Sequence, residues 1–474
     1  MGDNRKTETA RQNRWESLKR VIVLQLSLVG LLLQTGVYAY FWFTAYYPDA
    51  VRLKLKFYFN GHALILLIYF FLLLFFSNTY GGTKIGYLKP LDVILSQAFS
   101  LLAVNVISYF QISLMRNWLV EIGPMVWTMA LQVLLSILWV NLSDAIYKKV
   151  FPPRQMLLVH GERPIEDILN KFASRPDKYR IADCVNIAEG EEKVREQIDS
   201  GRFGAVVLWD IPTPQRNHLM KYCFGISMRT YVMPKIPDVL TKGSSQLHLF
   251  DTPLYLTREY ALTFEQRFWK RAIDIVCALL LLILSSPITI VTAIAIKAYD
   301  GGPVFYKQIR CTLGQKEFGI IKFRSMKVDA EKDGVARLAA KNDSRITPIG
   351  RFIRAVRIDE LPQLINILKG EMSFIGPRPE RPQIIAQYME EMPEFGYRTK
   401  VKAGLAGYAQ VYGKYNTTPY DKLKLDLTYI QNYSVWLDLK LMLLTLKILI
   451  QPESTEGVEQ NQVTAMKRAK EEEK

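Results

Sequence analysis

The sequence predicts an α-helical membrane bundle, a Rossmann-like α/β module, and a mainly α-helical (α+β) C-terminal domain with a re-entrant membrane helix-hairpin. Three observations predict this class. Four long apolar runs fill the first third of the chain, strand-like and helix-like segments alternate in the middle, and a fifth apolar run contains a Ser-Pro pair. A length of 474 residues is enough for about three domains of ordinary size.

Composition excludes several classes of protein. The hydrophobic fraction of 49% argues against a disordered chain and against a transporter that fills the membrane. The net charge of +16 comes from basic residues on both sides of a nearly neutral middle region. The cysteines lie too far apart for a zinc-type pair or a disulfide scaffold: Cys184, Cys223, Cys277 and Cys311. No histidine follows His248, so chemistry beyond that point needs another type of base.

We predict a basic segment at 1–20 and a four-helix transmembrane bundle at 21–150. The apolar runs are close to the ~20 residues that a bilayer requires. The alternative is a set of buried helices in a soluble protein. The first run is too long for a signal-peptide core and lacks a cleavage-like end, so we expect it to be retained. The runs are 21–43, 62–77, 91–114 and 125–147.

Flanking charges predict the orientation of the bundle. Basic residues precede the first run, and Lys148, Lys149 and Arg154 follow the fourth. An even number of spans puts both clusters on one side, which the positive-inside rule makes cytoplasmic. Basic residues in the first loop, at 52–56, argue weakly against this. We therefore expect an inner-membrane protein with its other domains in the cytoplasm.

Residues 151–250 predict the α/β module. The expected strands are 155–160, 179–187, 205–211 and 229–234, and the expected helices are 165–172, 191–200 and 215–226. The first strand is followed by Gly-Glu-Arg-Pro, which lacks the glycines of a dinucleotide-binding fingerprint. We expect no nucleotide here, with a degenerate ligand site as the alternative.

The fifth apolar run, 273–296, predicts a hairpin that enters the membrane and returns. Ser286 and Pro287 lie near its midpoint, and proline removes a backbone donor. Basic residues flank both ends, which a simple span does not satisfy. A serine hydroxyl near the break can hydrogen-bond a freed carbonyl. The alternative is a kinked fifth span. The preceding aromatic and basic residues, 264–271, indicate an interfacial amphipathic stretch.

The C-terminal domain, 251–451, contains three clusters of phosphate-type donors. Guanidinium groups bind phosphate oxygens bidentately, so three clusters suit a diphosphate. Solvated basic faces or contacts with anionic lipid are the alternative. The clusters are Lys322 with Arg324; Arg351, Arg354 and Arg357, spaced as on one helical face; and Arg378 in a proline-locked loop.

The adjacent acids Asp359 and Glu360 stand between these clusters. Pro362 suits a first helical turn and Gly370 suits a helix end, so Asp359 is expected at or next to the N-cap. There the helix dipole and the arginines would hold it ionised. An ionised carboxylate can attack phosphorus without a histidine base and form an acyl phosphate. A simple helix cap is the alternative.

The run 357–379, RIDELPQLINILKGEMSFIGPRP, resembles the signature of the bacterial sugar transferase family, the polyprenyl-phosphate hexose-1-phosphate transferases. The resemblance extends over about 265–450. It includes Lys270-Arg271 with Asp274, Ser286-Pro287, Gly302-Pro303-Val304-Phe305, Lys322-Phe323-Arg324-Ser325-Met326, Leu427-Thr428-Tyr429 and Trp436-Leu437-Asp438. With its upstream regions the chain is similar to the long form of this family, such as undecaprenyl-phosphate galactose or glucose phosphotransferases.

The resemblance implies a two-step transfer of sugar-1-phosphate from a UDP-sugar to undecaprenyl phosphate, which starts capsule or exopolysaccharide synthesis. Asp359 matches the nucleophile. Glu360 matches a second acid that would bind Mg²⁺ or assist the second attack. The remaining matched or candidate residues are Lys322, Arg324, Arg354, Arg357 and Arg378 for phosphates or nucleotide, Ser286 and Pro287 for the hairpin, and Asp426 and Asp438 as acids of unassigned role.

Several expectations remain open. Galactose and glucose are the leading sugars, followed by an N-acetylated sugar. Ala403 stands where the family has proline, which predicts a less rigid loop. We expect membrane lipid as a partner, a homodimer, no nucleic acid, and a disordered tail at 452–474. The rival functions are a polytopic transferase with direct attack and a non-catalytic membrane scaffold of polysaccharide export.

Overall fold

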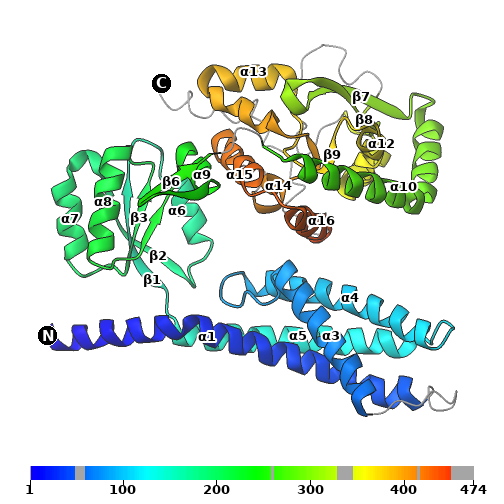
Figure 1. Cartoon of the computed structure of the whole chain (residues 1–474), viewed down its shortest axis with the longest axis horizontal. Coiled ribbons are helices and arrows are strands. Elements are labelled where there is room, and N and C mark those ends of the chain that lie inside the picture. The colour runs from blue at the N-terminus through cyan, green and yellow to red at the C-terminus, as the bar shows by residue number, and fades with distance from the viewer. Residues whose placement is uncertain (1, 49–58, 258–260, 328–344, 414–416, 450–474) are drawn as a thin grey trace. The chain divides into compact units, whose positions relative to one another are not determined.

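The structure, a computed structural model, describes residues 2–48, 59–257, 261–327, 345–413 and 417–449. The chain forms two compact units, Met1–Pro234 and Lys235–Lys474, which Figure 1 shows from one side. The predicted disordered tail and the basic residues of the first loop lie outside the described residues.

Four long helices open the first unit, as the apolar runs predict. In α1 the last helical turns continue into a short π-helical stretch, Trp42–Tyr46. Each of the four has the length and hydropathy to cross a membrane. Their bounds are α1 Gly2–Phe41, α3 Phe59–Tyr80, α4 Pro90–Met115 and α5 Gly123–Val150.

A buried network of amide and hydroxyl groups joins all four helices. Gln34 Nε2 of α1 donates to the Gln132 carbonyl of α5 at 3.1 Å, and Gln132 Nε2 donates to Tyr69 Oη of α3 at 2.8 Å. Tyr69 Oη donates to Asn105 Oδ1 of α4 at 2.8 Å, and Asn105 Nδ2 donates to Gln132 Oε1 at 2.9 Å. In an apolar surrounding such groups have few other partners, so they hold the helices together.

A four-stranded parallel sheet in the order β2-β1-β3-β4 completes the first unit. This α/β region was predicted, and its order is the start of the doubly wound 2-1-3-4-5 arrangement. Apolar side chains cover both faces, and every residue of β3 is buried. The elements are β1 Arg154–His160, α6 Glu166–Ala173, β2 Tyr179–Asn186, α7 Glu191–Asp199, β3 Ala205–Trp209, α8 Thr213–Gly225 and β4 Thr230–Val232, with a 3₁₀ turn at Ile187–Glu189.

The second unit begins earlier than the predicted domain boundary at 250. Helix α9, Ile236–Lys242, places Ile236 and Val239 in the same apolar core as α12 and α15. A hairpin of β5, Ser245–Leu249, and β6, Thr252–Leu256, follows it. The segment 235–256 therefore belongs structurally to the C-terminal unit.

Helix α10, Phe264–Asp300, contains the segment predicted as a hairpin. It is one continuous helix with Pro287 inside, rather than two helices separated by a break, and Figure 1 shows it as two arms that meet at a bend. Pro287 cannot donate to the Ile283 carbonyl, and Ser286 Oγ donates to that carbonyl at 2.8 Å instead. The hydroxyl thus supplies the partner that proline removes, as the sequence predicts. The return of this helix to the same membrane face stays a prediction.

The remaining elements pack on both arms of α10. The segment before the bend contacts β9, α12 and α16, and the segment after it shares an apolar cluster with β8 and α11. Strands β7 and β8 form an antiparallel pair, while β9 and β10 form a short parallel pair. The elements are β7 Phe305–Cys311, β8 Glu317–Phe323, α11 Pro348–Ala355, α12 Gln363–Lys369, β9 Ser373–Ile375, α13 Pro382–Glu391, β10 Gly404–Ala406, α14 Tyr408–Tyr412, α15 Pro419–Gln431 and α16 Val435–Leu449, with 3₁₀ turns at Leu313–Gln315, Ile358–Glu360 and Pro393–Lys400.

Candidate active site

Buried charges of α10 hold the strand that leads into the site. Lys270 Nζ donates to the Ile375 carbonyl of β9 and to Asp438 Oδ2 of α16, each at 2.7 Å. One turn later, Asp274 Oδ1 accepts from Ser373 Oγ and the Phe374 amide, each at 2.9 Å. Asp438 therefore neutralises a buried lysine and orders β9, and in this structure it serves packing.

Asp359 and Glu360 lie in the 3₁₀ turn Ile358–Glu360, between α11 and α12. Arg357 precedes the turn in a left-handed conformation with φ +60°, which turns the chain sharply. Helix α11 has already ended at Ala355, so the predicted single helical face of three arginines does not form. The predicted N-cap position of Asp359 is also wrong, because Pro362 occupies the N-cap position of α12 and makes no side-chain capping hydrogen bond.

The Asp359 carboxylate is buried and incompletely satisfied. Its Oδ1 atom has no hydrogen-bond partner, which is rare for a buried acceptor. Burial and the charge of Glu360 raise the pKa of Asp359, and they outweigh Lys322, Arg354 and Arg357, which lower it. The arginines that were expected to favour the ionised form do act on this carboxyl, but burial and Glu360 have the larger effect on its pKa. A poorly solvated carboxylate with an unpaired lone pair is a more reactive nucleophile than a solvated one.

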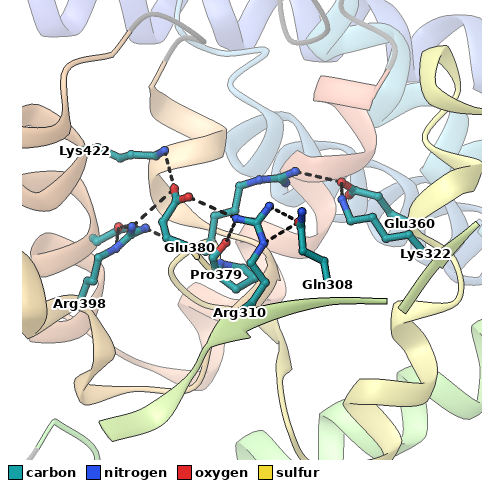
Figure 2. A network of polar contacts seen from close by, with 10 residues as sticks. Gln308, Arg310, Lys322, Glu360, Pro379, Glu380, Arg398 and Lys422 are labelled. Atoms are coloured by element: carbon teal, nitrogen blue, oxygen red, sulfur yellow. Dashed lines mark hydrogen bonds and ion pairs between the residues drawn. The ribbon is translucent and has the colours of Figure 1, made fainter. Parts of the chain in front are cut away.

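Glu360 gathers the cations of the site. Its Oε1 atom lies 3.1 Å from Arg378 Nη2, 3.3 Å from Lys322 Nζ and 3.7 Å from Arg357 Nη1. Burial raises the pKa of Glu360. The three cations lower this pKa by a larger amount, so that it lies well below its ordinary value. Figure 2 shows Lys322 beside Glu360. Three cations from separate segments thus surround one carboxylate next to Asp359.

Asn366 places Lys322 at this point. The Asn366 side chain of α12 accepts from the Ile321 amide at 3.0 Å and donates to the Gly319 carbonyl at 2.9 Å, so it holds β8 by two backbone groups. Asn366 is fully buried. Lys322 is the next residue of β8 after Ile321, so the position of this strand places the Lys322 ammonium beside Glu360.

Close backbone contacts hold the loop with Arg378. The Gly404 amide donates to the Pro377 carbonyl and the Gly376 amide donates to the Ala406 carbonyl, each at 2.9 Å. A Cβ atom on Gly376 would lie 2.3 Å from the Lys402 carbonyl oxygen, so a larger residue there would push the two segments apart. Together with the flanking prolines, these contacts fix the backbone position of Arg378.

Glu380, which was not among the predicted site residues, forms a second acidic centre. Its carboxylate lies 3.2 Å from Lys422 Nζ, 3.5 Å from Arg310 Nη1 and 3.7 Å from Arg398 Nη1, as Figure 2 shows. Burial raises the pKa of Glu380, but the three cations prevail and lower it to about 2. The sequence feature that could have indicated this centre is the position of Glu380 between Arg378 and Arg381 in a proline-rich loop.

Arg324 does not join the cations around Glu360. Its guanidinium donates twice to Asp300 and once to the Pro303 carbonyl at 2.7 Å, and it is buried. This ties the end of α10 to β8. Asp426 binds Arg398 and is described further below. Ser286 and Pro287 belong to the bend in α10.

A magnesium ion at the two adjacent carboxylates stays a prediction, and the observation in its favour is the unpaired Asp359 Oδ1. No group of three metal-type side chains occurs among the residues that the structure describes. Mg²⁺ is, however, usually held by one or two carboxylates together with substrate phosphates. The unpaired Oδ1 of Asp359 and the neighbouring carboxylate of Glu360 supply such a donor set.

The fold and the site define a membrane protein with two adjacent carboxyl groups, one of which is surrounded by three cations. The family model described as "Bacterial sugar transferase" matches residues 265–452. A UDP-glucose:undecaprenyl-phosphate glucose-1-phosphate transferase of Caulobacter vibrioides is 40% identical over 186 residues, which cover 38% of this chain and 69% of that protein. The chain belongs to the bacterial sugar transferase family.

Two longer relatives also match part of this chain. A UDP-N-acetylgalactosamine-undecaprenyl-phosphate N-acetylgalactosaminephosphotransferase of Aeromonas hydrophila is 42% identical over 39% of this chain and 44% of its own length. A UDP-glucose:undecaprenyl-phosphate glucose-1-phosphate transferase of Escherichia coli K12 is 40% identical over 44% of this chain and 47% of its own length. The chain thus spans about half the length of these curated relatives.

Proposed function

We propose that this protein transfers sugar-1-phosphate from a UDP-sugar to undecaprenyl phosphate, with Asp359 as a covalent nucleophile. The observation that carries the proposal is the buried Asp359 carboxylate, with an unpaired Oδ1, next to a carboxylate surrounded by three cations. The names of the relatives support undecaprenyl phosphate as the acceptor.

In the first step an Asp359 oxygen attacks the phosphorus that carries the sugar. The bond from that phosphorus to the oxygen bridging the two phosphates breaks, and UMP leaves with the bridging oxygen. Arg378, Lys322 and Arg357 lie where they can stabilise charge on the phosphate oxygens. An acyl phosphate joins the sugar-1-phosphate to Asp359.

In the second step a phosphate oxygen of undecaprenyl phosphate attacks the same phosphorus. The bond to the Asp359 oxygen breaks, which restores the carboxylate and yields undecaprenyl-diphosphate sugar. The acceptor phosphate is already ionised at neutral pH, so no histidine is required. Glu360 keeps the cations of the site in place while the first leaving group is exchanged for the acceptor.

Asp359 and Glu360 would hold the proposed Mg²⁺ together with the substrate phosphates. When bound, the ion supplies charge neutralisation between anions that otherwise repel one another. The protein's own cations remain paired with Glu360 and order the loop with Arg378.

The proposed setting is the bacterial inner membrane, with the second unit facing the cytoplasm and the bent helix α10 returning to that face. A lipid acceptor then reaches Asp359 without leaving the bilayer. We further propose that the reaction starts capsule or exopolysaccharide synthesis and that the chain acts as a homodimer, which native mass spectrometry in detergent tests directly.

Incubation of the purified protein with labelled UDP-sugar and no lipid acceptor tests the mechanism. We expect stoichiometric UMP release and label on the protein, both lost in Asp359→Asn, because an amide is a poor nucleophile. Release of UMP only when lipid is present would favour direct attack. An Asp359→Asn variant that still makes lipid-linked sugar would disprove the assigned nucleophile, and an inactive wild type would favour a scaffold.

The sugar is best assigned by the same assay. The relatives named above act on glucose and N-acetylgalactosamine, and we keep galactose, glucose and an N-acetylated sugar as candidates. UMP release measured across UDP-glucose, UDP-galactose, UDP-N-acetylglucosamine and UDP-N-acetylgalactosamine ranks them by kcat/KM.

A further inference from the structure

Helix α15 contributes one charged side chain that contacts the loop with Arg378 and Glu380, and a second that pairs with a neighbour of that loop. Lys422 contacts Glu380, as described above, and Asp426 pairs with Arg398 of the 3₁₀ turn Pro393–Lys400. Arg398 Nη2 lies 2.8 Å and Nε 3.1 Å from Asp426 Oδ2. Both partners are almost completely buried, at 2% and 1% exposure. Figure 2 shows Arg398 on the opposite side of Glu380 from Glu360.

Arg398 also holds the backbone of the loop. Its Nη2 atom donates to the Arg378 carbonyl oxygen at 3.0 Å. The guanidinium of Arg378 in turn donates to Glu360 Oε1 at 3.1 Å. A continuous chain of polar contacts therefore runs from Asp426 through Arg398 and Arg378 to Glu360, the neighbour of Asp359.

The cost of burying this pair indicates a role beyond packing. A buried ion pair is no more stabilising than apolar residues of similar volume, because both charges lose their hydration. An apolar pair, however, has no donor for the Arg378 carbonyl. The planar fork of arginine can bind a carboxylate and a carbonyl at once, and Asp426 keeps that fork charged and oriented. The contacts thus favour a positioning role for both residues.

We propose that Arg398 and Asp426 are positioning residues for the transfer reaction. They fix Arg378 so that its guanidinium faces Glu360 and the phosphates beside Asp359, and they do not touch the substrate themselves. This inference rests on the proposed function. A displacement of about 1 Å in a positioned group can lower a rate by about 100-fold, so a small shift of the Arg378 backbone has a measurable effect.

A double-mutant cycle tests the proposal with kcat and KM for UMP release. We expect Arg398→Gln and Arg378→Ala each to lower kcat/KM by about tenfold to 100-fold. In the double variant the second substitution should add less than about threefold, because Arg398 acts through Arg378. Asp426→Asn should lower kcat/KM less than Arg398→Gln and show the same non-additivity with Arg378→Ala.

Lys424→Gln is the matched control. Lys424 is a buried cation of α15, the helix that carries Asp426, and its Nζ atom pairs with Asp421 Oδ1 at 2.8 Å. Its loss should change the melting temperature without changing kcat/KM. If Arg398→Gln does not fold, Arg398→Lys replaces it, since lysine keeps the charge but lacks the fork.

Two results would overturn the positioning role. One is wild-type kcat/KM in a folded Arg398 or Asp426 variant. The other is full multiplication of the losses in the double variant, which would indicate an effect independent of Arg378. Absence of UMP release from the wild type would instead remove the proposed function and this inference together.

Discussion

Two neighbouring carboxyl groups of this protein behave in opposite ways. Burial and the adjacent negative charge raise the pKa of Asp359, whereas three cations lower the pKa of Glu360. The difference arises because the cations contact Glu360 Oε1 and leave Asp359 Oδ1 without a partner. One acid therefore pairs with the cations of the site, and the other is buried with one oxygen unpaired.

We predict that Asp359→Asn stabilises the fold at neutral pH. The ionised Asp359 is less favourable in the folded chain than in the unfolded chain, so its removal should raise the melting temperature by about 2 °C or more. The gain should be complete above the raised folded pKa and should vanish as the pH falls through it toward the ordinary value near 3.9. Differential scanning fluorimetry between pH 4 and 8 measures it.

Glu380→Gln provides the contrast of opposite sign. The pKa of Glu380 is lowered to about 2 by its cations, so its ionised form stabilises the fold above the ordinary glutamate pKa. This variant should melt below the wild type at neutral pH. A lower melting temperature for Asp359→Asn at pH 7 would contradict the assigned burial effect.

At the level of secondary-structure elements, the segment around Ala403 lacks the proline ring expected there but is held by hydrogen bonds instead. The Ala403 amide donates to Thr312 Oγ1 at 3.1 Å, and Thr312 Oγ1 donates to the Glu371 carbonyl at 2.8 Å. Ala403 is buried, and its carbonyl accepts from the Ser373 amide at 2.9 Å. The loop that alanine was expected to loosen is thus held by hydrogen bonds on both sides of its peptide.

We predict that Ala403→Pro destabilises this chain although relatives are expected to carry proline there. Proline lacks the amide hydrogen, so the bond to Thr312 is lost at a cost of about 1 kcal/mol. The melting temperature should fall by about 2–4 °C.

The same substitution in a Thr312→Ala background is the control. There the amide has no hydroxyl to lose, and proline should be neutral or stabilising by about 0.4–1 kcal/mol. An equal decrease in both backgrounds would show that proline acts through a clash rather than through this hydrogen bond.

At the scale of the whole molecule, the two units have separate apolar cores. The core of the second unit contains only residues from Ile236 onward, and the site residues Lys322, Asp359, Glu360 and Arg378 all belong to that unit. The first unit has its own sheet core and its own polar network between helices.

We therefore predict that a truncated chain beginning at Lys235 keeps most of its UMP release in lipid nanodiscs. The Caulobacter vibrioides relative, of which this chain matches 69%, supports a smaller functional unit. The same truncated chain with Asp359→Asn controls for contaminating activity. A folded but inactive truncated chain would show that the first unit takes part in the reaction.

Features that depend on neighbouring residues can be predicted from the amino-acid sequence. Hydropathy predicts the long helices, alternation predicts the parallel α/β region, and the Ser286–Pro287 pair predicts a disturbed helix with a hydroxyl donor. The motif around Asp359 indicated the family. These signals are local, because each depends on backbone hydrogen bonding or burial within a few turns.

Which charged side chains contact one another could not be predicted without the three-dimensional fold. Lys322 and Arg378 come from distant segments to one oxygen of Glu360, which the nearby Arg357 also contacts, while Arg324, equally basic and two residues from Lys322, binds Asp300. The same folding made Asp426 a partner of Arg398 and Glu380 a second centre. Charge pairing depends on distances across the fold and on lost hydration, and neither quantity is encoded in residue spacing along the chain.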